Sequence, residues 1–221
     1  MLNREVGYIR ELHSTAKVPV FGLASDNLEI GRIHGRQLAA LLPRGGTVLY
    51  IQGPAETDAC KLRTTGMYET RPGNVQVKTV KGNWTEGSAF KATNAWLRLA
   101  TSQHTRIDLV AAQNDAMAAG AKKAFQQFAR EAQGRERWLS VPFVGCDGVA
   151  KTGQAWVRSG LLTATVVLPA LTGTALEMLR PGLQSGNAQA EMTYAAPRSF
   201  TAMENLASIG AQASCSAAAS R

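Results

Sequence analysis

The sequence predicts an α/β protein built on a doubly wound, mainly parallel sheet. Short apolar runs rich in β-branched residues alternate along the chain with longer segments of helical periodicity. Single helices separate successive runs, which is typical of right-handed βαβ units. The length of 221 residues corresponds to about one and a half domains of average size. A chain of this length can bury a hydrophobic core of its own.

The first predicted elements are a helix over residues 28–42 and a strand over residues 47–51. Asp26 and Glu29 form a capping-box-like start to the helix, and Pro43 ends it. The strand is an apolar, partly β-branched run between glycines, as expected of a buried strand. The later elements continue the alternation, with strands at 75–80, 107–112, 139–144 and 162–168 and helices at 86–99, 115–130, 150–159 and 171–183.

The two ends of the chain lack this regularity. In residues 1–22 we expect at most one or two short strands, around Leu2 and around 18–23. From about residue 187 the sequence is irregular. The Ala/Ser-rich segment 211–221 has no core pattern, so it is expected to form a mobile tail.

Charge and cysteine content argue against several classes of protein. The net charge is +8, but Lys and Arg are spread along the chain without an aromatic-interleaved basic run. This favours an ordinary basic surface over a nucleic-acid interface. The three cysteines, Cys60, Cys146 and Cys215, are odd in number and far apart. Their spacing excludes a disulfide-stapled mini-domain and a CxxC metal site.

The sequence also gives no reason to expect direct membrane insertion. The uncharged segment 161–176 contains Pro169 and is better explained as a strand followed by a helix than as a membrane span. No apolar stretch follows the first four residues, so we expect no signal peptide within this sequence.

Motifs for enzyme chemistry are missing. The chain has no GxxxxGK[ST] or GxGxxG loop, no HExxH and no GxSxG elbow. His13, His34 and His104 are not spaced as metal ligands. Cys146 lies in a predicted strand-end loop and would be a nucleophile only if a histidine approached it; a small packed residue is the favoured interpretation. We therefore expect no enzyme, no cofactor and no metal.

Polar side chains follow the predicted strands at the edge where α/β sheets bind ligands. Arg63, Trp84, Asn114 and Asp147 form a set suited to a hydroxyl-rich ring such as a sugar. Arginine donates, aspartate accepts, asparagine does both, and an indole covers the apolar ring face. The set is therefore a candidate binding site for a neutral, hydroxyl-rich ligand.

Each of these residues also has a purely structural interpretation. Arg63 would equally suit a helix surface, and Trp84 would suit a cap on the core. An N-cap is the better interpretation for Asp115, with Asn114 as the alternative. The Asp147-Gly148 pair would serve as a tight turn. Their joint placement at one sheet edge is what favours binding.

Six segments, in order, resemble the type I periplasmic binding proteins for sugars, the ribose/galactose-type solute-binding subunits of ABC transporters. These segments are SDN at 25–27 with Gly31, RTTGM at 63–67, NW at 83–84, QNDAMAAGA at 113–121, GCDG at 145–148 and GLLTATV at 160–166. The resemblance covers about residues 2–186, and 113–121 is its most specific segment. It implies that Arg63, Trp84, Asn114 and Asp147 contact a sugar, and that Asn3 and Arg4 are further ligand contacts beside the hinge.

The resemblance also implies a division into lobes. Residues 1–25 would be a remnant of the N-terminal lobe, 26–167 the C-terminal ligand-binding lobe, 168–193 a return into the first lobe, and 194–221 a final segment with a mobile tail. Hinge crossings would fall at Ser25-Asp26, Val167-Leu168 and about Met192-Thr193. Most of the first lobe is missing from this pattern, and so is the family's glutamine before Pro169. Without the first lobe, we expect weak or absent sugar binding by this chain alone.

The function that follows is a truncated substrate-binding component of a bacterial ABC-type sugar transporter. Its partners would be a monosaccharide-like ligand and a membrane permease, and its location would be the periplasm. The alternative is the effector domain of a lactose-repressor-type transcription regulator, which has the same fold and motifs. A third hypothesis is a doubly wound enzyme with an unrecognised site.

Overall fold

The computed structural model describes residues 7–103, 105–131, 135–185 and 190–219. Two compact units divide the chain: unit 1 comprises Met1–Asp26 and Leu168–Pro197, and unit 2 comprises Asn27–Val167 and Arg198–Arg221. The chain therefore passes between the units three times. The third passage lies after Pro197, later than the expected position near Met192-Thr193.

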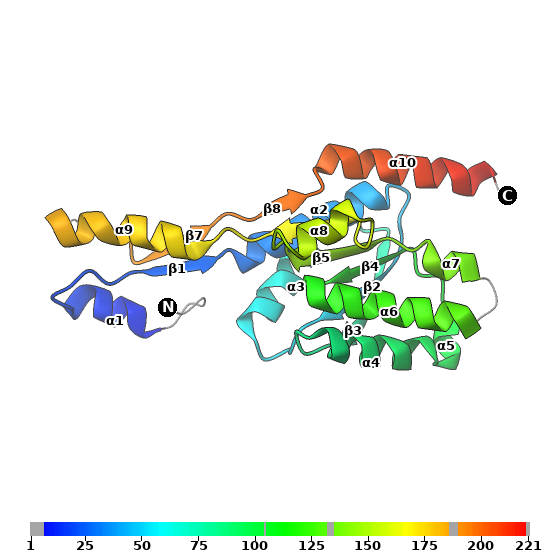
Figure 1. The fold of residues 1–221 in the computed structure, drawn as a ribbon, viewed down its shortest axis with the longest axis horizontal. Coiled ribbons are helices and arrows are strands. Elements are labelled where there is room, and N and C mark those ends of the chain that lie inside the picture. Colours follow the sequence, from blue (N-terminus) through cyan, green and yellow to red (C-terminus); the bar gives the residue numbers. More distant parts are fainter. Residues whose placement is uncertain (1–6, 104, 132–134, 186–189, 220–221) are drawn as a thin grey trace. The chain divides into compact units, whose positions relative to one another are not determined.

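Unit 2 contains a six-stranded sheet with the order β3-β2-β4-β5-β6-β8 (Figure 1). All neighbouring strands are parallel except β6 and β8, which are antiparallel. The mainly parallel α/β fold predicted from the sequence is therefore confirmed. The elements of this unit are α2 (Asn27–Leu41), β2 (Gly46–Gln52), α3 (Asp58–Thr70), β3 (Val75–Lys81), α4 (Glu86–Leu97), α5 (Ala100–Gln103), β4 (Leu109–Ala112), α6 (Asp115–Glu131), α7 (Arg135–Leu139), β5 (Phe143–Asp147), α8 (Gly153–Arg158), β6 (Ala164–Val167), β8 (Arg198–Phe200) and α10 (Met203–Ala219).

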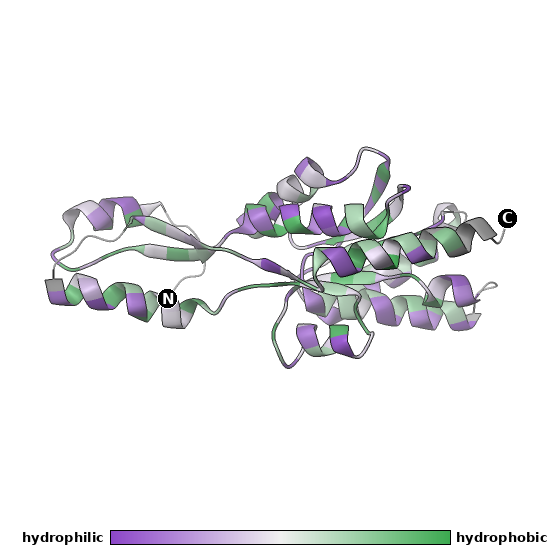
Figure 2. Cartoon of the chain, turned by 90° about the horizontal axis from the view of Figure 1, so that it is seen from above, coloured by the Kyte–Doolittle hydropathy of each residue, from purple (hydrophilic) through white to green (hydrophobic). Residues whose placement is uncertain are grey.

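Helices cover both faces of this sheet. Side chains of β2 alternate between the faces, so that Val48 and Tyr50 pack with α2, α3 and α10 while Leu49 and Ile51 pack with α4 and α6. This period of two is the pattern of a strand buried on both sides. Figure 2 shows that the covering helices mix hydrophobic and hydrophilic residues, as expected of helices with one buried face.

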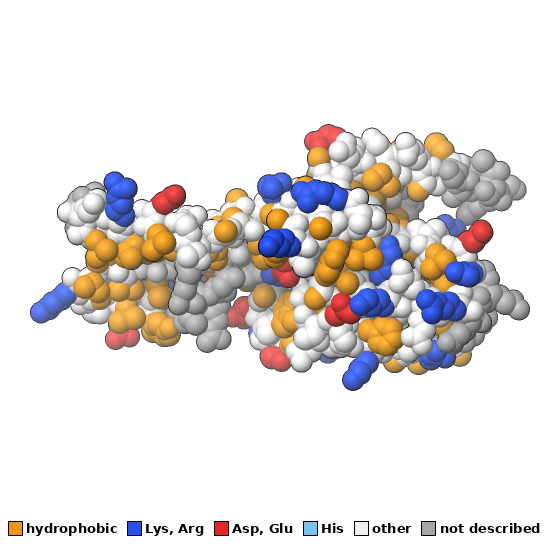
Figure 3. All heavy atoms as spheres, viewed as in Figure 1, with side chains coloured by type: hydrophobic (Ala, Val, Ile, Leu, Met, Phe, Trp, Pro, Cys, Tyr) orange, Lys and Arg blue, Asp and Glu red, His pale blue; other side chains and the backbone are white. Residues whose placement is uncertain are grey.

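Unit 1 is smaller, and its described residues form two helices and two strands. These are α1 (Tyr8–Thr15), β1 (Gly22–Ser25), α9 (Leu171–Ser185) and β7 (Met192–Ala195). The two strands pair in parallel, from Gly22 opposite Met192 to Ser25 opposite Ala195. Figure 3 shows hydrophobic side chains gathered on this unit. Its exposed large apolar residues include Tyr8, Leu12, Val18, Leu176, Leu183 and Tyr194.

Several elements differ from the sequence prediction. The segment 211–221, expected to be a mobile tail, is mostly helical, because α10 extends to Ala219. The first half of this helix is anchored by Leu206, which is completely buried. Residues 8–15 form a helix where at most short strands were expected. The strand expected at 139–144 begins only at Phe143, since Leu139 ends α7 and Pro142 has no N–H to donate to a sheet. Within the described ranges, no helix is both long and apolar enough to cross a membrane.

Candidate functional site

The strand order of unit 2 reverses between β2 and β4. From β2 the chain moves outward to β3, whereas from β4 it continues in the other direction to β5 and β6. Parallel sheets bind ligands beyond the carboxyl ends of the strands at such a reversal. Four of the six predicted site residues, Arg63, Trp84, Asn114 and Asp147, lie in or next to the segments that follow β2, β3, β4 and β5.

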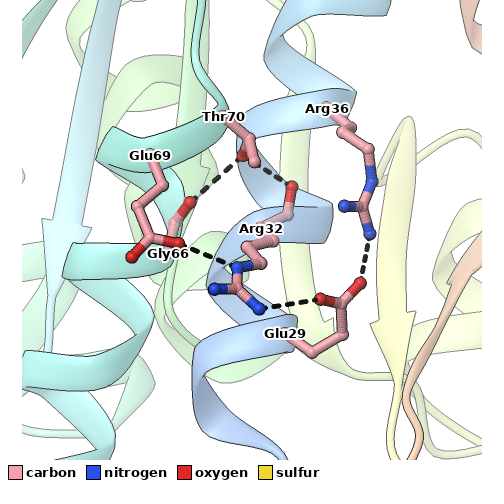
Figure 4. Close-up of polar contacts among 6 residues, drawn as sticks. All are labelled: Glu29, Arg32, Arg36, Gly66, Glu69 and Thr70. Carbon is pink, nitrogen blue, oxygen red and sulfur yellow. Dashed lines mark hydrogen bonds and ion pairs between the residues drawn. The ribbon is translucent and has the colours of Figure 1, made fainter.

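Arg63 owes its position to close packing between α2 and α3. A Cβ atom on Gly31 of α2 would overlap the backbone carbonyl of Arg63, so only glycine allows this approach. At the far end of the same contact, the Thr70 hydroxyl donates to the carbonyl oxygens of Arg32 at 2.8 Å and Gly66 at 3.1 Å (Figure 4). Backbone-to-backbone packing of this kind fixes where α3 presents Arg63.

Ion pairs on the solvent side hold the same two helices together. Arg32 Nε donates to Glu69 Oε2 at 2.8 Å, which links α2 to α3. Glu29 in turn pairs with Arg32 and Arg36 within α2 (Figure 4). All four side chains are partly exposed, so we expect each pair to stabilise the contact only modestly.

The guanidinium group of Arg63 is buried, with 8% of the residue exposed. Its Nε donates to Asn27 Oδ1 at 3.0 Å, and its Nη1 donates to the carbonyl oxygen of Gln113. The guanidinium carbon also lies 5.6 Å from the centre of the Trp84 ring. Arg63 Nη2 forms no hydrogen bond with the described residues, so it is available as a donor to a ligand.

Trp84 is half-buried and adopts a positive φ of 59°. Its indole lies against Gly53, where a Cβ atom would overlap the ring. Its carbonyl oxygen accepts a hydrogen bond from Asn114 Nδ2 at 2.9 Å. These contacts from the ends of β2 and β4 hold the indole beside Arg63, so the ring and the guanidinium group border the same space.

Asn114, rather than Asp115, is the N-cap of α6. Asn114 Oδ1 accepts from the backbone N–H of Met117 at 2.8 Å, which is the N-cap hydrogen bond. The preference for Asp115 as the cap is therefore wrong. An amide has two donors and two acceptor lone pairs, so Asn114 keeps one donor and one lone pair for a ligand. The capping and binding interpretations of this residue are compatible.

Asp147 ends β5 with a positive φ of 107°. Burial raises the pKa of its carboxyl group to about 6, while the nearby positive charge of Arg63 acts in the opposite direction. No described residue donates a hydrogen bond to this carboxylate. Because the group is ionised above about pH 6, it is an acceptor without a hydrogen-bond partner in the described part of the chain, and a ligand hydroxyl would satisfy it.

Gln113 is a site residue whose role the sequence reasoning did not identify. Its side chain is fully buried. It follows β4 and forms hydrogen bonds with residues in and just after β2 and within α3. Oε1 accepts from the Gly53 N–H at 2.9 Å, and Nε2 donates to Tyr50 Oη at 3.1 Å and Thr64 Oγ1 at 3.0 Å. Its placement beside Asn114, directly after a buried strand, was the available signal.

The remaining sequence candidates do not join this group. Asn3 and Arg4 lie outside the described residues. Cys146 is fully buried, and burial raises the pKa of its thiol to about 12, which disfavours the reactive thiolate. His34 approaches the neighbouring carbonyl of Gly145, 2.9 Å from Nε2, and burial lowers its pKa to about 4. Among the described residues, no cluster of His, Cys, Asp or Glu could hold a metal ion.

The fold and this edge define an α/β domain with polar and aromatic side chains gathered at the switch point of its sheet. The profile of a family described as "Periplasmic binding protein domain" matches residues 16–175. The chain therefore belongs to the periplasmic binding protein domain family, as the resemblance of its motifs indicated.

Two curated relatives are similar in sequence. The chain is 29% identical over 174 residues to the ribose import binding protein RbsB of Salmonella typhimurium, covering 73% of this chain and 55% of that protein. It is 28% identical over 177 residues to the D-xylose-binding periplasmic protein of Escherichia coli, covering 76% of this chain and 49% of the relative. The chain thus spans about half the length of these relatives.

A solved structure shows the same fold. The periplasmic binding protein component of the arabinose ABC transporter from Shewanella sp. ANA-3, solved with arabinofuranose bound, superimposes with a TM-score of 0.72 at 22% identity. The match covers 97% of this chain and 76% of that one. At this identity the likeness shows the fold alone.

Proposed function

We propose that this chain binds a monosaccharide at the strand-end edge of unit 2 and serves as the substrate-binding component of a periplasmic ABC-type sugar importer. The main observation behind the proposal is that a hydrogen-bond donor and a hydrogen-bond acceptor at this edge lack partners among the described residues. Asp147 offers a carboxylate and Arg63 offers Nη2, and neither forms a hydrogen bond there with the described residues. Adjacent sugar hydroxyls both donate and accept, so they match this combination.

Trp84 and Asn114 complete the proposed contacts. The indole would pack against the apolar face of the sugar ring, and Asn114 would use its remaining donor and lone pair on a hydroxyl group. Because Gln113 bonds to Arg63 and Asn114 bonds to Trp84, this part of the edge is preorganised, and preorganisation lowers the entropic cost of binding. The names of the relatives, which describe ribose import and xylose binding, support this class of ligand and favour import over transcription regulation.

The experiment is a titration with D-ribose, D-xylose and L-arabinose, followed by calorimetry and by tryptophan fluorescence. We expect binding of at least one pentose, with a dissociation constant raised about fivefold or more by Trp84→Ala and by Asp147→Asn, since each removes a contact worth about 1–3 kcal/mol. The matched control is Asp58→Asn, because the Asp58 side chain is 83% exposed on α3. Equal affinity in all four proteins, or no binding of any pentose, would contradict the proposal.

A further inference from the structure

Asp115 holds a buried carboxyl group that the binding site does not use directly. It is the first residue of α6 and is 3% exposed. Oδ2 accepts from the backbone N–H of Gly148 at 2.8 Å, and Oδ1 accepts from Thr165 Oγ1 at 2.6 Å. One side chain therefore connects the start of α6, the turn after β5 and the middle of β6.

The surroundings of this carboxyl group are shaped to hold it. A Cβ atom on Gly145 or Gly153 would overlap its oxygens, so both glycines leave room that the carboxyl group fills. No lysine or arginine among the described residues forms an ion pair with it. Burial without a cation is unfavourable for a carboxylate, and it raises the pKa of Asp115 to about 7. The hydrogen bonds to Gly148 and Thr165 are what offset this cost.

The turn that Asp115 contacts carries the proposed ligand-binding aspartate. Asp147 and Gly148 both have positive φ, 107° and 60°. This conformation is unfavourable for an aspartate, so the surrounding structure must hold it. Gly148 is held on both sides: its N–H donates to Asp115, and its carbonyl oxygen accepts from Gln154 Nε2 at 2.8 Å.

From this geometry we propose that Asp115 is a positioning residue, which holds the N–H of Gly148 and thereby keeps the Asp147 carboxylate directed at the ligand. The inference rests on the proposed function, because it assigns Asp147 to the ligand. It adds a residue that need not touch the sugar. It also explains why the turn can keep a non-glycine residue at positive φ.

Two substitutions of Asp115 distinguish the effect of its hydrogen bonds from the effect of its negative charge. Asp115→Asn keeps an oxygen that can accept from Gly148, and its amide nitrogen can donate to the Thr165 hydroxyl. Asp115→Ala removes both hydrogen bonds. The matched control is Asp108→Ala: Asp108 also accepts from a backbone N–H, that of Thr47 at 2.9 Å, but at the start of β2 and β4, the opposite edge of the sheet.

The first measurement is the affinity for D-ribose, together with hydrogen exchange of the Gly148 amide by NMR. We expect Asp115→Ala to raise the dissociation constant and the exchange rate at least about tenfold, the loss of one charge-assisted hydrogen bond. Asp115→Asn and Asp108→Ala are expected to stay within about threefold of the wild type in affinity. Rapid exchange at Gly148 with unchanged ribose affinity in Asp115→Ala would overturn the inference.

The second measurement needs no sugar, so it separates a failure of the inference from a failure of the proposed function. The Cα and Cβ chemical shifts of Asp147, which report its φ, are expected to move in Asp115→Ala and to stay in Asp108→Ala. Unchanged shifts would overturn the inference even if the wild type binds no pentose. If Asp115→Ala does not fold, the wild type decides: the Gly148 amide proton must follow the titration of the Asp115 carboxyl carbon as well as that of the adjacent Asp147, and the part due to Asp115 must vanish in Asp115→Asn.

Discussion

The buried carboxyl group of Asp115 predicts a specific dependence of stability on pH. Burial disfavours its charged form and raises its pKa from the ordinary aspartate value of 3.8 to about 7 in the folded chain. Between these two values the folded state binds more protons than the unfolded state. Stability from this group is therefore complete below about pH 4 and is lost as the pH rises towards about 7.

The magnitude follows from the size of the shift. Between about pH 5 and pH 7 the carboxyl group is ionised in the unfolded state but largely protonated in the folded state, and each pH unit of this difference corresponds to about 1.4 kcal/mol. Asp115 should thus reduce the free energy of unfolding by about 3 kcal/mol between about pH 5 and about pH 8. Asp115→Asn removes this contribution. His34 also titrates, but it is present in both proteins and cancels in the comparison, whereas the charge of Asp147 is part of what raises the pKa of Asp115.

The assay is urea unfolding at about pH 5 and about pH 8. All four tryptophans lie in unit 2, so their fluorescence reports unfolding of the unit that contains Asp115. We expect the difference in unfolding free energy between Asp115→Asn and the wild type to shift by about 3 kcal/mol in favour of Asn at the higher pH. Asp108→Asn should show no such shift. Parallel pH profiles for Asp115→Asn and the wild type would refute the assigned burial and titration.

Three further predictions concern the site, the C-terminal helix and the thiols. Sugar affinity should fall as the pH decreases through about 6, where Asp147 becomes protonated, and this dependence should be absent in Asp147→Asn; calorimetry at several pH values checks it. Leu206→Ala should lower the free energy of unfolding by about 2–5 kcal/mol, because Leu206 is fully buried. The control Ser208→Ala, at an exposed position of the same helix, should change it little. Equal free energies of unfolding for the two variants would contradict the packing of α10. A thiol reagent should modify only the exposed Cys215 in the native chain and all three cysteines after denaturation; rapid native labelling of Cys146 would show that it is accessible.

The sequence predicted those elements of unit 2 whose own residues carry a strong pattern. The strand at 47–51 is largely apolar and β-branched, and the helix expected at 115–130 is observed as Asp115–Glu131. It could not predict α10, because this helix is Ala/Ser-rich and packs through Met203, Leu206 and a close approach of Gly210 to Ala40 rather than through a long apolar stripe. It likewise missed α3, where close contact through Gly31 and Gly66 takes the place of an apolar stripe.

The candidate site was predictable in composition but not in detail. The rule that ligands bind beyond strand ends was sufficient to select Arg63, Trp84, Asn114 and Asp147. It could not distinguish the cap of α6 from its neighbour, because both Asn and Asp are favourable N-caps. Only the three-dimensional contacts show that Asn114 takes this role while Asp115 turns inward to Gly148 and Thr165.

The central claim is that a sugar binds at the strand-end edge of unit 2, and an NMR titration of the ¹⁵N-labelled chain with D-ribose tests it most directly. We expect saturable shifts in the Trp84 indole N–H, the Arg63 Nε–H, the Asn114 side-chain amide and the backbone of Asp147. Signals from the opposite edge, such as Asp108, should stay in place. Shifts confined to that opposite edge, or a spectrum unchanged by D-ribose, D-xylose and L-arabinose alike, would contradict the claim.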